Sequence, residues 1–181
     1  MSRRKAASFP TLLWDLLSFP KDPPRRRPST STTITTTRPA PPRQRGSRKQ
    51  QQYDELVRTM KKRYGIRINR WRSSTTGCAW QVEYHNGSIS RLIEAPYPRG
   101  PVSAAVFLHE IGHHAIGFYR YKPRCYEEYK AWMWSLQAMR DNDINITPRV
   151  EKLVDSCLRY AVAKARRRRI KRLPVELVKY L

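Results

Sequence analysis

The sequence predicts an α+β fold built around a small three-stranded antiparallel sheet. Apolar residues recur at helical spacing in the segment 53–64 and again in segments after residue 101. Between these helical regions lie three short segments with the character of β-strands. The dipeptide Asn86-Gly87 separates the last two of them, and Asn-Gly favours a tight hairpin turn. We therefore expect a helix, then three strands, then further helices.

Residues 1–50 differ in composition from the rest of the chain. They contain eight of the fourteen prolines, twelve basic residues and two acidic ones, and the stretch 29–37 is nearly all Ser and Thr. Such a segment cannot bury enough apolar surface to offset the entropy lost on ordering. We predict a disordered basic arm, in which the apolar cluster 12–17 is either a short docking helix or an exposed apolar patch.

Residues 51–146 are expected to form one domain. Its first helix carries one apolar face and ends at Gly65; the face consists of Tyr53, Leu56, Val57, Met60 and Tyr64. Three strands are expected at 66–71, 79–84 and 88–94. Two helices follow at about 102–116 and 125–140, the first opened by Gly100-Pro101 and ended by Gly117.

Residues 147–181 are expected to form a basic helical extension. Thr147-Pro148 is a strong helix start, with a capping side chain and then proline at the first helical position. The helix has an apolar face made of Val150, Leu153, Val154, Cys157, Leu158, Ala161, Val162 and Ala165. Its end carries seven basic residues in the nine from Lys164 to Arg172, and Pro174 begins a short terminal helix.

The segment His109-Glu110-Ile111-Gly112-His113-His114 contains the pattern HExxH. Residues four apart lie on one face of a helix, so His109 and His113 can bind one metal ion together. Glu110 can then act as general base toward a water on that metal. His114 lies about 140° around the helix from His109, so we expect it to be exposed or to serve packing. The remaining histidine, His85, belongs to the hairpin turn.

A third metal ligand is needed, because catalytic zinc takes three protein ligands and leaves the fourth position to water. The acidic candidates are Glu127 and Glu128 on the following helix. The spacing of the residues by itself leaves both open.

The apolar context of the motif (Val106, Phe107, Ile111, Gly112 and Ala115) and the spacing of Glu128 from Ala131 resemble the gluzincin zinc peptidases. The short spacing is most similar to the minigluzincin group, which includes ImmA/IrrE-type peptidases. The resemblance covers about residues 53–140, although Trp132 stands where relatives often have an aspartate.

This resemblance implies that the sheet packs on the HExxH helix and on the glutamate helix. It also implies that His109, His113 and Glu128 hold Zn²⁺ and that Glu110 is the base. The expected activity is hydrolysis of peptide bonds in a protein or peptide substrate that pairs with an edge strand, for which 88–94 is our candidate. An oxyanion donor is expected among Tyr119, Tyr121 and Tyr126.

The formal net charge is +23, which favours anionic partners. For the run from Lys164 to Arg172 we expect phosphate-driven, salt-sensitive contact with nucleic acid, aided by the basic arm. A solvated helix end, an anionic membrane or an acidic protein partner are the alternatives. No nucleic-acid reading motif is evident. The rival function is a nucleic-acid-binding accessory protein whose HExxH helix is structural or holds zinc without catalysis.

The three cysteines, Cys78, Cys125 and Cys157, are widely spaced and form no CxxC pair. This pattern disfavours a disulfide framework and favours an intracellular, cytoplasmic setting. No apolar run approaches the roughly 20 residues of a membrane span. The N-terminal segment is a poor secretory signal, and an organellar transit peptide is the alternative.

Overall fold

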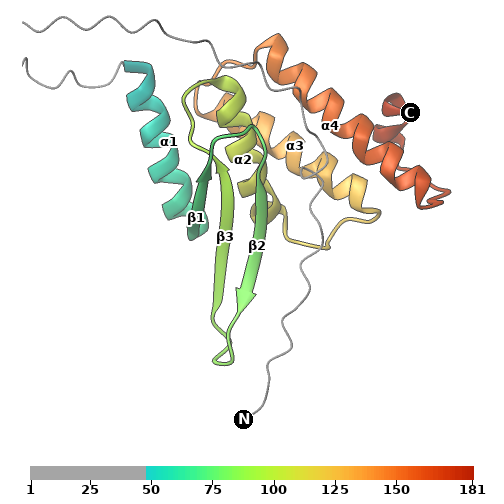
Figure 1. The fold of residues 1–181 in the computed structure, drawn as a ribbon, viewed down its shortest axis with the longest axis horizontal. Coiled ribbons are helices and arrows are strands. Elements are labelled where there is room, and N and C mark those ends of the chain that lie inside the picture. The colour runs from blue at the N-terminus through green and yellow to red at the C-terminus, as the bar shows by residue number, and fades with distance from the viewer. Residues whose placement is uncertain (1–47) are drawn as a thin grey trace, which may run out of the picture.

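The computed structural model describes residues 48–181, so most of the predicted arm, including the cluster 12–17, lies outside the described residues. The first helix begins at Arg48, slightly before the predicted domain boundary. Figure 1 shows the order of the elements, which are α1 (Arg48–Tyr64), β1 (Ile66–Arg72), β2 (Cys78–Glu83), β3 (Ile89–Pro96), α2 (Pro101–Ile116), α3 (Arg124–Asp141), α4 (Pro148–Arg167) and a terminal 3-10 helix (Val175–Tyr180). The α+β class and the predicted order of elements are confirmed.

The sheet is mixed, so the prediction of a wholly antiparallel sheet is wrong. Its strand order is β1-β3-β2, with β1 parallel and β2 antiparallel to β3. The predicted hairpin joins β2 to β3 through Asn86-Gly87, where Gly87 has a φ of 76°. β1 and β2 follow each other in the chain but are not neighbours in the sheet, because β3 lies between them. Ile93 and Ala95 of β3 are completely buried. The strand with the most buried side chains therefore occupies the middle of the sheet.

The helices lie in successive layers on this sheet. α2 packs against β3 and β2, α3 packs on α2, and α4 packs on α3 (Figure 1). Because α2 lies between the sheet and α3, every residue from Ala104 to His114 is buried. A helix enclosed in this way carries any polar side chain of its sequence into the interior.

The C-terminal extension is part of the same fold. α4 buries Val150, Val154, Cys157, Leu158, Ala161, Val162 and Ala165, all members of the predicted apolar face. The terminal 3-10 helix buries Leu177 and Tyr180. None of the helices over residues 48–181 combines the length and apolar character that crossing a lipid bilayer requires.

Candidate metal centre

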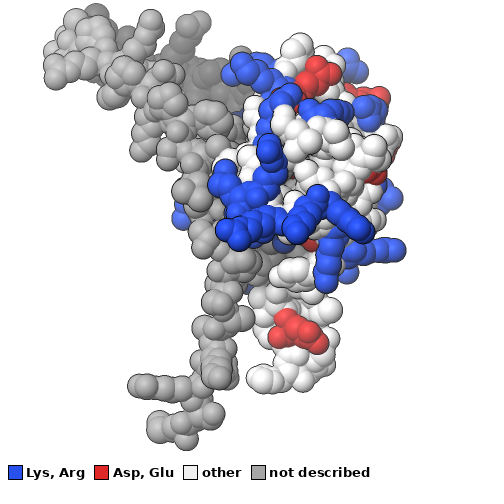
Figure 2. Space-filling model, turned by 90° about the vertical axis from the view of Figure 1, so that its right-hand side faces the viewer, with Lys and Arg blue, Asp and Glu red and all other residues white. Residues whose placement is uncertain are grey.

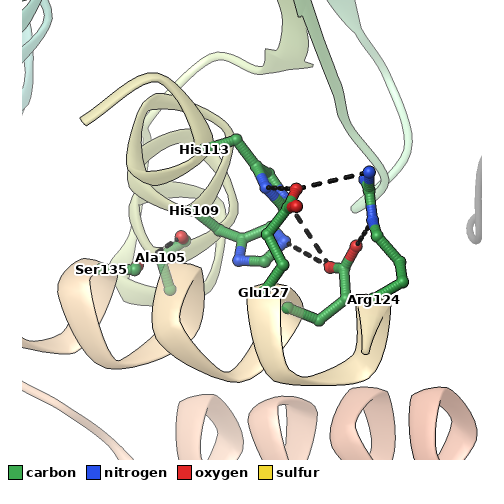
Figure 3. Close-up of polar contacts among 7 residues, drawn as sticks. Ala105, His109, His113, Arg124, Glu127 and Ser135 are labelled. Carbon is green, nitrogen blue, oxygen red and sulfur yellow. Dashed lines mark hydrogen bonds and ion pairs between the residues drawn. The ribbon is translucent and has the colours of Figure 1, made fainter. Parts of the chain in front are cut away.

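Two histidines and one glutamate of α2 are enclosed at the contact between α2 and α3. His109, Glu110 and His113 are 0%, 2% and 4% exposed. The rings of His109 and His113 have centroids 4.8 Å apart, as expected of side chains four residues apart on one helix face. Both rings point toward α3 (Figure 3).

Glu128 of α3 meets both rings. Its Oε2 lies 3.3 Å from Nε2 of His109 and 3.6 Å from Nε2 of His113. In a tetrahedral zinc site with bonds of about 2.0–2.1 Å, ligand atoms are about 3.4 Å apart. His109, His113 and Glu128 therefore form a buried group that could hold a metal ion.

Glu127 lies against the other side of the His113 ring. Its Oε1 is 3.5 Å from Nδ1 of His113, and its Oε2 accepts a hydrogen bond of 2.9 Å from the backbone N–H of Tyr119. In metal sites, a carboxylate in this position accepts from the ring nitrogen that does not bind the metal and thereby orients the imidazole. Of the two glutamates that the spacing left open, the geometry favours Glu128 as the third ligand and Glu127 as its support.

Arg124 fixes both carboxylates. Its guanidinium pairs with Glu127 Oε1 at 3.3 Å and donates to Glu128 Oε1 at 3.1 Å (Figure 3). Glu128 can thus be held through one oxygen while the other faces the histidines. Arg124 is not among the predicted site residues, although its i, i+3 and i, i+4 spacing to two glutamates is a signal that could have identified it.

Gly112 lets the two helices approach each other. A Cβ atom at this position would lie 2.9 Å from the carbonyl oxygen of Ala131 and 3.2 Å from the ring of Trp134. Nearby, the hydroxyl of Ser135 donates to the carbonyl of Ala105 at 2.8 Å. The close contact between Gly112 and Ala131 therefore sets the distance between the histidines of α2 and the glutamates of α3.

The electrostatics of the group suit a cation. Burial alone would raise the pKa of the Glu128 carboxyl, but the charge of His113 and hydrogen bonds from both histidines hold it well below its usual value. Burial acts to lower the pKa of His113, but the Glu128 charge and the contacts with Glu127 and Glu128 raise it to about 10. Burial lowers the pKa of His109 to about 4. Positive charge is therefore stable between the two rings and Glu128.

Several buried atoms of this cluster form no hydrogen bond of good geometry, although three of them have the ion-pair contacts of 3.3–3.5 Å described above. Within residues 48–181 these are His109 Nδ1, His109 Nε2, His113 Nδ1, Glu110 Oε1 and Glu127 Oε1. Buried polar atoms without partners are costly. Coordination of a metal ion would satisfy Nε2 of His109, so these residues fit such a group.

Glu110 is enclosed beside the candidate ligands. Burial raises the pKa of its carboxyl to about 8. Gly77, which precedes β2, packs on it so closely that a Cβ at position 77 would be 2.5 Å from Glu110 Oε1. This contact was not visible in the sequence, because the two residues are far apart in the chain. A carboxyl group with a pKa near neutrality at a cleft suits a general base.

A cleft of ≈ 780 Å³ opens onto the cluster, and Glu110, His113 and Glu128 line it. One wall is the start of β2, from Gly77 to Ala79, and another is the C-terminal half of α4. Of the three tyrosines expected as oxyanion donors, only Tyr119 lines this cleft. The hydroxyl of Tyr126 donates to Glu176 instead, at 2.9 Å.

The edge strand at the cleft differs from the predicted one. The candidate 88–94 falls in β3, which is the central strand and is paired on both sides. β2 is the strand of the described sheet that both borders the cleft and has an unpaired edge. The correction follows from the strand order, which local sequence patterns do not specify.

The remaining residues discussed in the sequence, His114, His85 and Trp132, are not among the candidate metal ligands. His114 is buried rather than exposed, and its Nε2 lies 3.0 Å from the carbonyl oxygen of Leu92 on β3. It therefore serves packing, on the side of α2 away from the cluster. His85 is exposed in the hairpin turn. Trp132 stacks on His109, with centroids 4.1 Å apart and an interplanar angle of 21°.

Comparisons with protein-family models, with curated proteins and with solved structures gave no match to this chain. Its function is therefore inferred from the arrangement of its own side chains.

Proposed function

We propose that the protein is a zinc-dependent metallopeptidase of the gluzincin type. The observation that carries this proposal is the convergence of one ligand atom each from His109, His113 and Glu128 to within 4.8 Å of one another, beside the buried Glu110 carboxyl group in the same cleft. Two imidazoles and a carboxylate are ligands that zinc accepts, and three protein ligands leave a position for water.

Bound to this group, zinc would lower the pKa of a coordinated water from about 16 toward 7. The positive charge held by its neighbours favours the ionised form of Glu110. Glu110 then accepts a proton from water as the water oxygen bonds to the carbonyl carbon of the peptide. As the carbon–nitrogen bond breaks, Glu110 gives the proton to the leaving amine nitrogen. Tyr119 is the side chain we propose as hydrogen-bond donor to the developing oxyanion.

An extended substrate can bind by adding a strand to the free edge of β2. Backbone hydrogen bonds would hold the peptide in register, and the start of β2 lies next to Glu110 in the cleft wall. A free strand edge beside the cleft supports a peptide as the substrate.

The test compares Glu110→Gln with wild type, both loaded with zinc, on a mixture of fluorogenic peptides. Because Glu110 is not a ligand, the variant should keep its metal and lose about 10²–10⁴-fold in turnover. Glu151→Gln, an exposed change in the first turn of α4 and outside the cleft, is the matched control and should retain full activity. Equal turnover by Glu110→Gln and wild type would refute the mechanism.

A second candidate function, binding of nucleic acid, is supported by the exposed end of α4. Lys and Arg side chains gather on the face of the molecule that carries α4 (Figure 2). Within the described residues, Arg166, Arg169, Lys171 and Arg172 are exposed and have no acidic partner. A fluorescent oligonucleotide titrated with the metal-free protein at two salt concentrations tests this candidate. A steep loss of affinity at higher salt is the expected result.

A further inference from the structure

One face of α4 forms a wall of the cleft. Ala161, Lys164 and Ala165 line it, together with Arg168, the residue directly after the end of α4; spacings of three and four residues fall on one side of a helix. This wall therefore offers two small side chains, Ala161 and Ala165, and two cationic ones, Lys164 and Arg168. Only two of the seven basic residues from Lys164 to Arg172 line the cleft, namely Lys164 and Arg168. The other five lie outside it: Arg166, Arg167, Arg169, Lys171 and Arg172.

The cations of this wall have no acidic partner in the described part of the chain. Neither Lys164 nor Arg168 forms an ion pair within residues 48–181, and the same holds for Lys122 on the facing loop. Arg124, by contrast, is bound to Glu127 and Glu128. The cleft therefore has unpaired positive charge next to its metal-binding carboxylate.

Lys164 lines the same cleft as His113 and Glu128 of the candidate metal centre. Burial lowers the pKa of Lys164 most, and the charges of Arg168 and Glu128 also act on it. An anionic group bound by Lys164 and Arg168 would therefore lie in the cleft that Glu110 and Glu128 also line.

The shape of the cleft favours a peptide as the carrier of that anionic group. A volume of ≈ 780 Å³ is in the range of small-ligand sites and accommodates a short segment rather than a duplex. The start of β2 also lines the cleft, and β2 has a free edge where an extended chain can pair through its backbone.

We propose that the cleft selects peptide segments that carry Asp or Glu beside the cleaved bond, with Lys164 and Arg168 as the residues that determine this specificity. The inference rests on the proposed function, because it assumes that the bound peptide is cleaved, but the acid-binding site itself can be tested without catalysis.

The experiment measures binding to the zinc-loaded Glu110→Gln protein at 0.15 M salt, where the Debye length is about 8 Å. The probes are three fluorescein-labelled ten-residue peptides of Ala, Thr and Val whose two central residues are Glu, Gln or Lys. A labelled oligothymidylate is the fourth probe. We expect the Glu peptide to bind about tenfold more tightly than the Gln peptide, from two contacts of about fivefold or less each.

Two pairs of substitutions of equal charge identify the residues responsible. Lys164→Gln with Arg168→Gln should abolish the preference for the Glu peptide. Arg166→Gln with Lys171→Gln, which removes the same charge outside the cleft, should keep it. Lys164→Glu with Arg168→Glu should instead prefer the Lys peptide, a result that misfolding cannot produce.

Several outcomes would overturn the proposal: no preference in the parent protein, an equal loss in both glutamine pairs, or no reversal in the glutamate pair. Binding of the oligothymidylate through Lys164 and Arg168, without binding of the Glu peptide, would assign the wall to nucleic acid instead. If the Glu peptide binds as expected but zinc-loaded protein with Glu110 intact cleaves none of the peptides, the proposed peptidase function fails while the acid-binding site stands.

Discussion

Replacing Gly77 by alanine should displace the Glu110 carboxylate without changing any proposed metal ligand. The added Cβ would lie 2.5 Å from Oε1, 2.6 Å from Cγ and 2.7 Å from Cδ of Glu110. Ordinary contacts between such atoms are about 3.5–4.0 Å, so the carboxylate has to move by about 1 Å. Glu110 is only 2% exposed, so most of its surroundings are already packed and oppose this movement.

The expected cost follows from this displacement. A shift of about 1 Å at a reacting group lowers the rate by about 10²-fold, and overpacking of a buried contact costs about 1–3 kcal/mol of stability. Zinc affinity should change little, because His109, His113 and Glu128 are untouched. Turnover on the fluorogenic peptide mixture, zinc content and the free energy of unfolding in urea are the three measurements.

Gly100→Ala is the matched control. No atom lies within 4 Å of a Cβ built on Gly100, and its φ of −173° is extended backbone that any residue adopts. This variant should keep turnover near that of wild type. If Gly77→Ala also turns over substrate at the wild-type rate, Glu110 does not act from the position seen here, and its assignment as base is refuted.

Three further predictions concern the ligands, the packing and the charge of the cluster. Glu127→Gln should weaken zinc binding about 10–100-fold and Glu128→Gln considerably more, as measured by competition with a chromophoric chelator; equal losses would contradict the ligand assignment. Gly112→Ala should destabilise the protein by about 1–3 kcal/mol in urea unfolding, because the backbone of Ala131 obstructs the new methyl group; an unchanged midpoint would argue against the close helix contact. The pKa of His113 is raised from 6.5 to about 10, so its contribution to the stability of the metal-free protein is complete below pH 6.5 and is lost as pH rises toward 10. The pKa of Glu110 is raised from 4.5 to about 8, so between these pH values Glu110 binds more protons in the folded than in the unfolded chain. The free energy of unfolding therefore falls further up to pH 8. Urea unfolding with chelator at pH 6.5 and pH 9 measures this loss, and His113→Gln should reduce it; a flat profile in wild type would contradict the buried His113–Glu128 pair.

The parts of the fold that the sequence predicts are those with local causes. Gly100-Pro101 and Gly117 bound α2, and Asn86-Gly87 makes the hairpin, because backbone conformation at these positions depends on the residue itself. The two histidines of the motif and the acidic pair of α3 also follow from spacing along single helices.

The parts that it does not predict depend on contacts between distant segments. Parallel and antiparallel pairing of β1 are equally compatible with its local pattern, and only the position of β3 in the core decides between them. The contact of Gly77 with Glu110 joins a loop to a helix. The spacing of Lys164 and Arg168 shows that they share a helix face, but only the packing of α4 on α3 turns that face toward the cleft.

The most direct measurement is the metal content of the purified protein after incubation with zinc and removal of loosely bound ions, with His113→Ala prepared in parallel. Elemental analysis should find one zinc per wild-type chain and none in the variant. Three results would contradict the proposed centre. These are wild-type protein without metal, wild-type protein that contains iron in place of zinc, and equal zinc content in the two proteins.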